Sequence, residues 1–357
     1  MELLSVTMND GVKPRSEIEG KDNSSEDKSN YKIVRKGDMV YNSMRMWQGA
    51  NGISPCDGIV SPAYTVLMPK QEINNGYFAA LFKSANLINE FRKNSQGMTS
   101  DTWNLKYPQI ETIKIQIPSV SEQDKVSELF GVLDARIVAQ AQLIEALKKY
   151  KRGSLSALFP KKGEITPQYR FAGFTKPWEQ RKLGDVFTER TERANGDEEL
   201  LSVTIGNGVI RQVDSDKRNI ASEDKSNYKI VHKGDVPYNS MRMWQGAVGN
   251  SEYDGIVSPA YTVLVPSKEA NGKFFMELFK KESTLKIFQR WSQGLTSDTW
   301  NLKYPVLSTI EISIPRIEEQ KRISDYFANL DRLITLHQHK YDTLLSLKNA
   351  ILQQMFI

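Results

Sequence analysis

The sequence predicts an α+β protein with two globular domains in tandem repeat, each followed by a long helix, the two helices pairing as an antiparallel coiled coil. Three observations lead to this prediction. Residues 121–159 and 317–357 space their apolar residues in heptads. The stretch before each of them mixes strand and helix patterns. The whole arrangement occurs twice, and Leu3 aligns with Leu200 at an offset of 197 residues.

The two long helices are predicted from apolar residues that recur in alternating steps of four and three. An average spacing of about 3.5 is the seam of a coiled coil rather than the broader face of a surface helix. In the first helix the seam is Val126, Phe130, Leu133, Ile137, Ile144, Leu147 and Leu158. In the second it is Ile323, Phe327, Leu330, Ile334, His337, Tyr341, Leu344, Lys348, Ile351 and Met355.

Polar residues interrupt both seams at matching places. Gln140 aligns with His337, and Lys151 aligns with Lys348. A single polar residue on such a seam commonly sets the register of the two helices. We expect these positions to fix how the helices pair.

The repeat is close to literal in several blocks. Residues 3–12 (LLSVTMNDGV) reappear as 200–209 (LLSVTIGNGV). Four blocks recur without a change, at 25–34, 41–50, 57–67 and 99–108 and again at 222–231, 238–247, 254–264 and 296–305. A period this long indicates duplicated domains, because the repeats of a solenoid are several times shorter.

Within the first copy, local patterns predict strands at residues 32–40 and 59–67, a helix at 76–93, and a half-buried strand at 110–118. The predicted division is therefore a first domain at 1–120, a helix at 121–159, a linker at 160–176, a second domain at 177–316 and a helix at 317–357. One difference stands out. Residues 171–197 have no counterpart before Met1, so the first domain lacks an opening segment that the second domain has.

Composition restricts the class of protein. No apolar run approaches the length of a bilayer span, and residues 1–9 do not form a signal peptide, so we expect a soluble chain with no membrane partner. The single cysteine, Cys56, cannot form an internal disulfide and fits a reducing cytoplasm. A net charge of +5 and a pI of about 8.9 permit a polyanionic partner.

The sequence predicts neither a catalytic centre nor a metal site. The histidines are His232, His337 and His339, and the first two align with Arg35 and Gln140, so neither position requires an imidazole. No phosphate-binding P-loop or dinucleotide fingerprint occurs. Residues 235–238 (DVPY) resemble the amine-gripping tetrapeptide of adenine methyltransferases, but the repeat reads DMVY. Residues 26–28 and 223–225 (EDK) resemble half of a nuclease metal site without its upstream Pro-Asp, and charged turns explain them.

The repeated blocks are instead rich in side chains that contact bases or phosphates. Arginine forks match guanine O6 and N7, and glutamine matches adenine N6 and N7. Small hydroxyls beside a glycine, and lysines, suit phosphates. The predicted DNA-binding residues are Lys28, Ser43, Arg45, Gln48, Gln96, Thr99 and Ser100, with Lys225, Ser240, Arg242, Gln245, Gln293, Thr296 and Ser297 in the second copy. The alternative is that the Met-Arg-Met-Trp string is an ordinary strand with Met and Trp in the core.

Helix length adds a geometric argument. A helix of about 37 residues is about 55 Å long at about 1.5 Å per residue. Two such antiparallel helices would hold the globular domains at opposite ends. This arrangement resembles a reader of two half-sites separated by an unread gap.

These features together resemble the specificity (S) subunit of Type I restriction–modification systems. The resemblance covers essentially the whole chain. It depends on two recognition domains that each end in Ile-x-Ile-Pro (115–118 and 312–315), on the Glu-Gln pairs at 122–123 and 319–320 with the spacer helix that follows, on the linker at 171–183 (FAGFTKPWEQRKL), and on the ending at 351–357 (ILQQMFI).

The resemblance implies a non-catalytic DNA reader that binds no cofactor itself. It implies double-stranded DNA and two modification subunits as partners, the latter carrying S-adenosylmethionine and methylating adenine, and restriction subunits that use ATP and Mg²⁺ to translocate DNA. The near-identical domains predict near-identical half-sites, and hence a bipartite, near-palindromic target with adenine on each side. The missing opening segment leaves an alternative open: an assembly scaffold, or a truncated or rearranged S subunit, that binds partner subunits without reading DNA selectively.

Overall fold

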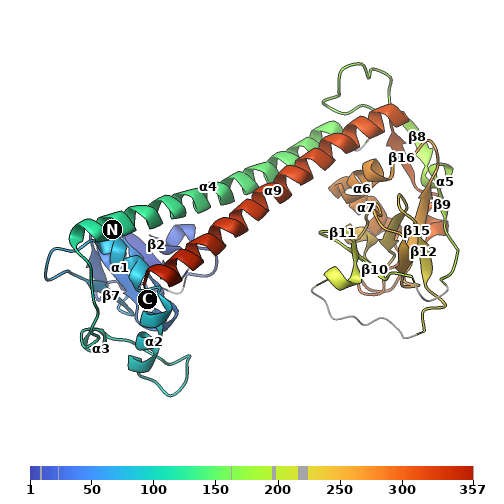
Figure 1. Ribbon diagram of the computed structural model, residues 1–357. Coiled ribbons are helices and arrows are strands. Elements are labelled where there is room, and N and C mark those ends of the chain that lie inside the picture. Colours follow the sequence, from blue (N-terminus) through green and yellow to red (C-terminus); the bar gives the residue numbers. More distant parts are fainter. Residues whose placement is uncertain (9, 23, 162, 195–197, 216–223, 357) are drawn as a thin grey trace. The chain divides into compact units, whose positions relative to one another are not determined.

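The computed structural model describes the chain except for residues 9, 23, 162, 195–197, 216–223 and 357. It divides into two compact units, Met1–Leu143 with His337–Ile357 (unit 1) and Ile144–Leu336 (unit 2). Each unit joins one globular domain to part of each long helix (Figure 1). The predicted α+β class, the tandem domains and the paired helices are confirmed. The boundaries predicted for the domains and the linker stay predictions. The two compact units are divided within the long helices, at residues 143–144 and 336–337, and not at the predicted domain ends.

The two long helices are α4 (Val120–Leu158) and α9 (Ile317–Met355), each of 39 residues. Most of the seam predicted for α4 is buried, including Phe130 and Ile144. The predicted seam of α9 is buried at its start, at Ile323 and Phe327. Near its end the predicted Met355 is 42% exposed and Leu352 is buried instead. An α-helix drifts by about 20° per heptad against a strict 3.5-residue repeat, so the buried stripe has moved by the last turn.

Within each unit the helix segments run antiparallel. In unit 1 the rings of Phe130 and Phe356 stack with centroids 6.1 Å apart. Gln140 Nε2 lies 2.7 Å from His337 Nδ1 and donates to the His337 carbonyl oxygen at 3.0 Å. One of the two pairs predicted to interrupt the seams, Gln140 with His337, is thus hydrogen-bonded across the helices.

The domain of unit 1 has two sheets, with strand orders β2-β1-β6-β3 and β5-β4-β7. Helices α1, α2 and α3 accompany them, and a buried aromatic cluster that includes Phe78, Phe82 and Phe91 forms the main core. The strands are β1 (Glu2–Thr7), β2 (Gly11–Pro14), β3 (Lys32–Val34), β4 (Met39–Asn42), β5 (Asn51–Ile53), β6 (Gly58–Val60) and β7 (Tyr64–Leu67). The helices are η1 (Arg15–Glu17), η2 (Met46–Gln48), α1 (Asn75–Leu81), α2 (Ala85–Asn94) and α3 (Tyr107–Ile110).

The domain of unit 2 repeats this plan and adds an opening segment. That segment supplies β8 (Glu179–Lys182), α5 (Leu183–Val186) and β9 (Phe187–Glu189). The remaining strands are β10 (Leu201–Thr204), β11 (Gly208–Arg211), β12 (Lys229–Val231), β13 (Val236–Asn239), β14 (Gly255–Val257), β15 (Tyr261–Pro266) and β16 (Glu311–Ile314). The helices are η3 (Gln212–Asp214), η4 (Met243–Gln245), α6 (Gly272–Lys280), α7 (Glu282–Trp291) and α8 (Tyr304–Leu307).

Three predicted elements of the first copy are each divided in two. The strand predicted at 32–40 is β3 and β4, because Gly37 turns the chain with φ of 92°. The strand predicted at 59–67 is β6 and β7, with Pro62 between them. The helix predicted at 76–93 is α1 and α2, because the Ser84 side chain accepts a hydrogen bond from Leu87 N and starts a new helix.

The strand predicted at 110–118 is wrong for unit 1 and right for its repeat. In unit 2 the equivalent segment is β16, which pairs antiparallel with β8. Among the described residues of unit 1 no strand follows Ile110, and Ile115 and Ile117 are 39% and 37% exposed. A strand needs a neighbour for its backbone donors and acceptors, and the described part of unit 1 holds no counterpart of β8.

Two general features of the described residues bear on function. None of their helices is long and apolar enough to cross a membrane. Among the same residues, no cluster of three or more His, Cys, Asp or Glu side chains has a metal-binding arrangement.

Candidate nucleic-acid interface

In each domain the predicted arginine and one predicted glutamine lie on one short turn, Arg45 with Gln48 and Arg242 with Gln245. Met46 in η2 and Met243 in η4 are fully buried, and a glycine in the left-handed region follows each turn, Gly49 with φ of 81° and Gly246 with φ of 84°. This conformation favours glycine because it has no Cβ. The Met-Arg-Met-Trp string is therefore a turn anchored by its second methionine, not a continuous strand.

Arg45 and Arg242 stand immediately before these turns, Arg45 exposed and Arg242 half-exposed. Neither guanidinium has a hydrogen bond, salt bridge or ring contact with any residue that the structure describes. The same holds for the side-chain amides of Gln48 and Gln245. Five N–H donors in a rigid fork, left without an internal partner, are available to an external acceptor.

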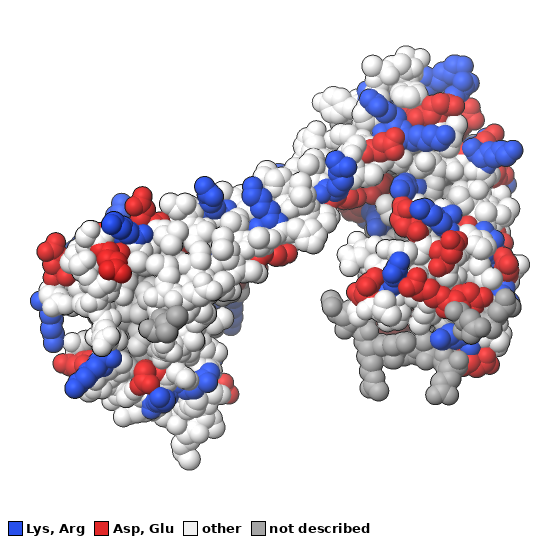
Figure 2. Space-filling view, in the orientation of Figure 1, with Lys and Arg blue, Asp and Glu red and all other residues white. Residues whose placement is uncertain are grey.

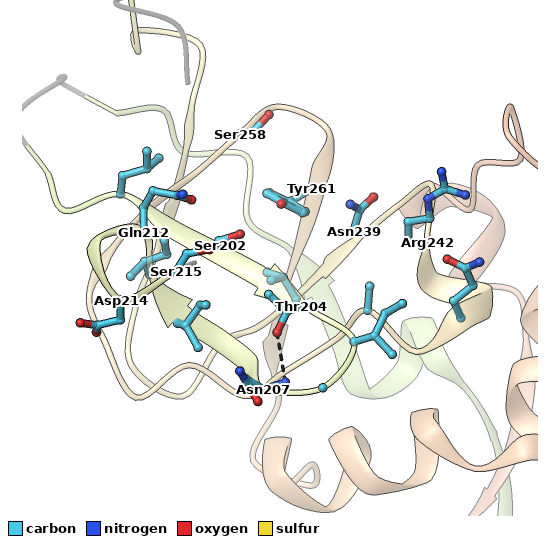
Figure 3. A pocket seen from close by; sticks show the side chains of 18 of the residues that line it. Ser202, Thr204, Asn207, Gln212, Asp214, Ser215, Asn239, Arg242, Ser258 and Tyr261 are labelled. Atoms are coloured by element: carbon cyan, nitrogen blue, oxygen red, sulfur yellow. Dashed lines mark hydrogen bonds between the residues drawn. The ribbon is translucent and has the colours of Figure 1, made fainter. Parts of the chain in front are cut away.

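In unit 2 these side chains line a groove of about 720 Å³. Figure 3 shows Tyr261 and Asn239 between the hairpin that carries Ser202 and Thr204 and the turn that carries Arg242. The hairpin is β10–β11, and its turn is closed by a hydrogen bond from Asn207 N to Thr204 Oγ1 at 3.0 Å. Other polar side chains lining the groove are Gln212, Asp214, Ser215, Gln245 and Ser258. The walls thus offer amides, hydroxyls and one free guanidinium, which suit base edges and phosphate oxygens.

A second candidate loop packs against the turn in each domain. In unit 1, Gln96 and Asn104 exchange backbone hydrogen bonds of 3.0 and 2.8 Å and close the loop. The rings of Trp47 and Trp103 meet edge-on at 5.1 Å and bring this loop against η2. In unit 2, Trp244 and Trp300 repeat the contact at 5.2 Å.

The loop between these anchors presents its predicted residues to solvent. Exposed members are Gln96, Thr99 and Ser100 in unit 1, and Gln293, Thr296 and Ser297 in unit 2. The structure therefore brings the predicted glutamine and hydroxyl residues beside the predicted arginine, in both units.

Two of the four predicted serines, Ser43 and Ser240, are placed differently from the exposed loop residues. Ser43 and Ser240 are buried, and their hydroxyls bond Thr65 at 2.9 Å and Thr262 at 2.8 Å. These bonds tie the turn to the neighbouring strand. A DNA contact by either hydroxyl therefore stays a prediction. The burial of both side chains argues against it.

The predicted lysines are also unequal. Lys28 is exposed, with its Nζ 5.9 Å from the Tyr31 ring centre, and Lys225 is half-buried beside Tyr228, which lines the groove. Residues 222 and 223 of the repeated block lie outside the described residues. On the visible face of each unit in Figure 2, the described basic and acidic side chains are interspersed.

Two buried tyrosines, Tyr41 and Tyr238, share hydrophobic clusters with Met46 and Met243 of the turns. Burial raises the pKa of the Tyr41 and Tyr238 hydroxyls above the ordinary value. Tyr238 Oη donates to the Leu302 carbonyl oxygen at 2.9 Å, directly after the second loop. Both hydroxyls stay protonated at neutral pH, which suits structural support and not proton transfer.

Sequence reasoning missed the hairpin wall of the groove. Ser202, Thr204 and Tyr261 were not predicted as contacts, although they lie in blocks that recur in the first copy as Ser5, Thr7 and Tyr64. The recurrence of residues 3–12 and 57–67 was the available signal. It did not show that these segments converge on the arginine turn.

The fold and the sites define a class: a duplicated binding protein, whose two modules present the same unpaired Arg and Gln and continue into long paired helices. The chain belongs to the Type I restriction modification DNA specificity domain family, whose model matches residues 5–149 and 175–346.

Curated relatives agree with this family. The Type I restriction enzyme MjaVIII specificity subunit of Methanocaldococcus jannaschii is 23% identical over 349 residues, which covers 90% of this chain and 78% of that protein. The Type I restriction enzyme HindI specificity subunit of Haemophilus influenzae is 22% identical over 187 residues, or 50% of this chain and 41% of that one.

Solved structures share the fold. The S subunit of a Type-I restriction–modification system from M. genitalium aligns with a TM-score of 0.55 and 13% identity, over 91% of this chain and 84% of that one. A chain from a structure described as the basis of complex assembly and conformational transition of the type I R-M system aligns with a TM-score of 0.51 and 16% identity, over 91% and 83%.

Proposed function

We propose that this chain is the DNA-reading subunit of a Type I restriction–modification complex and that its two domains read the two halves of a bipartite, near-palindromic target. The observation that carries the proposal is the unpaired Arg and Gln beside the same turn in both domains, Arg45 with Gln48 and Arg242 with Gln245. The block that holds each pair, YNSMRMWQGA, is identical in the two copies. Identical readers in identical local folds favour the same bases.

The chemistry of the groove supports a division of roles. The arginine is suited to a bidentate contact with guanine, and the glutamine to adenine. The exposed hydroxyl loops, with Thr99 and Ser100 or Thr296 and Ser297, are suited to the adjacent phosphates. Lys28 and Lys225 would add a salt-dependent contribution to affinity.

The remaining roles belong to partner proteins in this proposal. The paired helices α4 and α9 set the distance between half-sites and bind two modification subunits. Those subunits supply S-adenosylmethionine and methylate adenine, and restriction subunits supply ATP and Mg²⁺ chemistry. This chain itself is non-catalytic, acts in the cytoplasm, and positions its partners on DNA.

Methylome sequencing of the host with and without the gene tests the proposal. We expect one bipartite adenine-methylated motif, with similar half-sites in inverted orientation, to disappear with the gene. Re-expression of the wild-type chain should restore it. Two unrelated half-sites would contradict the near-palindromic target. Co-purification with modification subunits, but with no motif lost and no selective DNA binding, would favour the scaffold alternative.

A further inference from the structure

We infer that unit 2 carries a second binding site, separate from the candidate nucleic-acid interface, which takes the phosphate group of a small phosphorylated molecule. The site is a cavity of about 830 Å³ at the start of α7, lined by residues of α7, of α6 and of the end of α4. Its volume is typical of pockets that hold small molecules. None of its residues lines the groove beside Arg242, so the inference goes beyond the proposed function.

Unit 1 shows how the same helix start is satisfied within the protein. Helix α2 corresponds to α7 at the offset of 197 residues. The Ser84 hydroxyl accepts a hydrogen bond from Leu87 N at 3.4 Å, and Gln353 Oε1 accepts one from Ala85 N at 3.0 Å. Two N–H groups that the helix itself cannot satisfy are therefore bonded to side chains.

The corresponding start of α7 in unit 2 has no such bonds. Lys281 stands in place of Ser84, and Ser156 stands in place of Gln353. Helix α7 has no side-chain cap, and no described residue accepts a hydrogen bond from the backbone N–H groups of residues 282–284. Unpaired N–H groups at the positive end of a helix dipole favour a bound anion.

A buried hydroxyl points to a ligand independently of the helix dipole. Thr284 is only 4% exposed, and it lines the cavity. Its hydroxyl forms no hydrogen bond with any described residue, although a threonine within a helix can bond the carbonyl group four residues earlier. The corresponding residue of unit 1 is Leu87, which needs no partner. Burial of an unpaired hydroxyl costs free energy, and a phosphate oxygen would accept its hydrogen bond.

The side chains around the cavity carry a surplus of positive charge. The described basic residues that line it are Arg152, Lys161, Lys280, Lys281, Lys286 and Arg290. The described acidic residues that line it are Glu164, Glu282 and Glu311. Two of these carboxylates already have partners, Glu282 with Lys286 at 2.6 Å and Glu311 with the side-chain amide of Gln180 at 2.8 Å. The remaining balance favours an anionic ligand.

Most of the cations around the cavity are without an internal partner. Those whose side chains form no hydrogen bond or salt bridge with any described residue are Arg152, Lys161, Lys280 and Arg290. Burial lowers the pKa of the Lys280 and Lys281 ammonium groups, because both charges lie where water solvates them poorly. A phosphate group beside them would offset that cost.

These groups together identify the chemical class of the ligand. Helix N–H groups, a hydroxyl and cationic side chains all donate hydrogen bonds, and the several oxygen atoms of a phosphate can accept from them at once. The apolar side chains of Leu155, Leu278 and Ile287 also line the cavity, which leaves room for more than one phosphate group. A small molecule that carries phosphate fits this arrangement.

Calorimetric titration of the full chain with sodium pyrophosphate, at constant ionic strength, tests the inference. We expect saturable binding at one site, with slower hydrogen exchange at the amides of residues 282–284. Thr284→Val should weaken binding about tenfold, because it removes one hydrogen bond to a charged group. The control is Lys268→Ser, at an exposed lysine of the same unit outside the cavity, which should leave binding unchanged.

A double variant can reproduce the arrangement of unit 1 in unit 2. Lys281→Ser combined with Ser156→Gln supplies the two side chains that satisfy the start of α2. This variant should bind pyrophosphate about tenfold or more weakly, while its melting temperature is unchanged or higher because a helix cap has been added. Weaker binding in a chain that stays folded separates ligand recognition from a structural role.

Three results would overturn the inference. The first is no saturable binding of pyrophosphate. The second is binding that Thr284→Val and the double variant both leave unchanged, or that slows hydrogen exchange elsewhere. The third is displacement of pyrophosphate by a short DNA duplex that protects the same amides, since the phosphate would then belong to DNA. Pyrophosphate binding itself involves no DNA, so the proposed function can fail or hold separately.

Discussion

The two domains of this chain have nearly the same candidate interface and unequal scaffolds. Both hold the arginine turn, the tryptophan pair and the closed loop at nearly the same distances. Only unit 2 holds β8, α5 and β9 among the described residues. Segments with the same Ile-x-Ile-Pro ending are a strand in unit 2 and not in unit 1. The comparison shows that the local geometry of the arginine turn and the closed loop does not require the sheet edges to be closed.

The largest predicted difference follows from Trp178, which has no counterpart in unit 1. It is 3% exposed, and its Nε1 donates to Glu319 at 3.4 Å. Trp178→Ala should lower the free energy of unfolding of unit 2 by about 3–5 kcal/mol. Calorimetry should show a lower transition for unit 2 alone. Trp291→Ala, at a 47% exposed tryptophan of the same unit, is the control and should change little. An equal fall in both units would contradict the comparison.

The aligned lysines of the two helices, Lys151 and Lys348, should also contribute unequally to stability, with the larger contribution in unit 2. Lys151 lies 3.2 Å from buried Glu277 and 2.8 Å from Asp331, whereas the Lys348 ammonium pairs with Asp134, whose side chain is 54% exposed. Lys151→Met leaves Glu277 buried and unpaired and should cost about 3 kcal/mol. Lys348→Met should cost about 1 kcal/mol or less. Chemical denaturation of the two variants measures both.

The Lys151 variant should also change the pH dependence of unit 2. Burial raises the pKa of the Glu277 carboxyl, and the Lys151 ammonium opposes this. A carboxyl with a raised folded pKa favours the folded state at low pH, and this contribution is lost as pH rises through that pKa. The cost of Lys151→Met should therefore shrink as the pH is lowered. If the loss of stability caused by Lys151→Met does not change with pH, the unpaired Glu277 carboxylate is not its cause.

A smaller effect should be equal in the two domains. Arg242→Ala and Arg45→Ala should each relax selectivity at one base, by about 1–3 kcal/mol if the contact is bidentate. Gln245→Ala should do so at a neighbouring base. Selection of bound DNA from a random pool measures this, with the exposed Arg332→Ala as a control. A uniform loss across all sequences would indicate phosphate contacts, and a loss in one half-site only would break the equivalence of the domains.

The smallest effect on stability should come from Gln140→Leu combined with His337→Leu. Replacing both partners of a hydrogen bond with apolar residues is close to neutral. The double variant should remain folded and should accept a wider range of gaps between half-sites. Unchanged gap selectivity in methylome sequencing would show that this contact does not fix the register.

The long helices were predictable because a heptad pattern is local and sustained, and the buried positions of Phe130, Ile144 and Phe327 confirm it. The separation of α1 from α2 was not recognised, since the decisive signal was a single capping serine, Ser84. The state of residues 110–118 could not be read locally, because it depends on a partner strand elsewhere in the chain.

The candidate site was predictable in part, because its residues recur in both copies. Repetition identified Arg242 and Gln245, whose side chains the structure leaves unpaired. Repetition could not distinguish Ser240, which is buried against Thr262. It also could not show that Ser202 and Thr204 line the same groove as Arg242, since this depends on tertiary packing.

The contact between Gln140 and His337 has an evolutionary consequence. Each residue is the repeat equivalent of the other, so an ancestor with a single copy would have met itself at this point in a homodimer. In such a homodimer the same residue would stand on both helices at this contact, so every substitution there would occur twice. Duplication within one chain removed that restriction. An amide can now face an imidazole, and either side can mutate without the other.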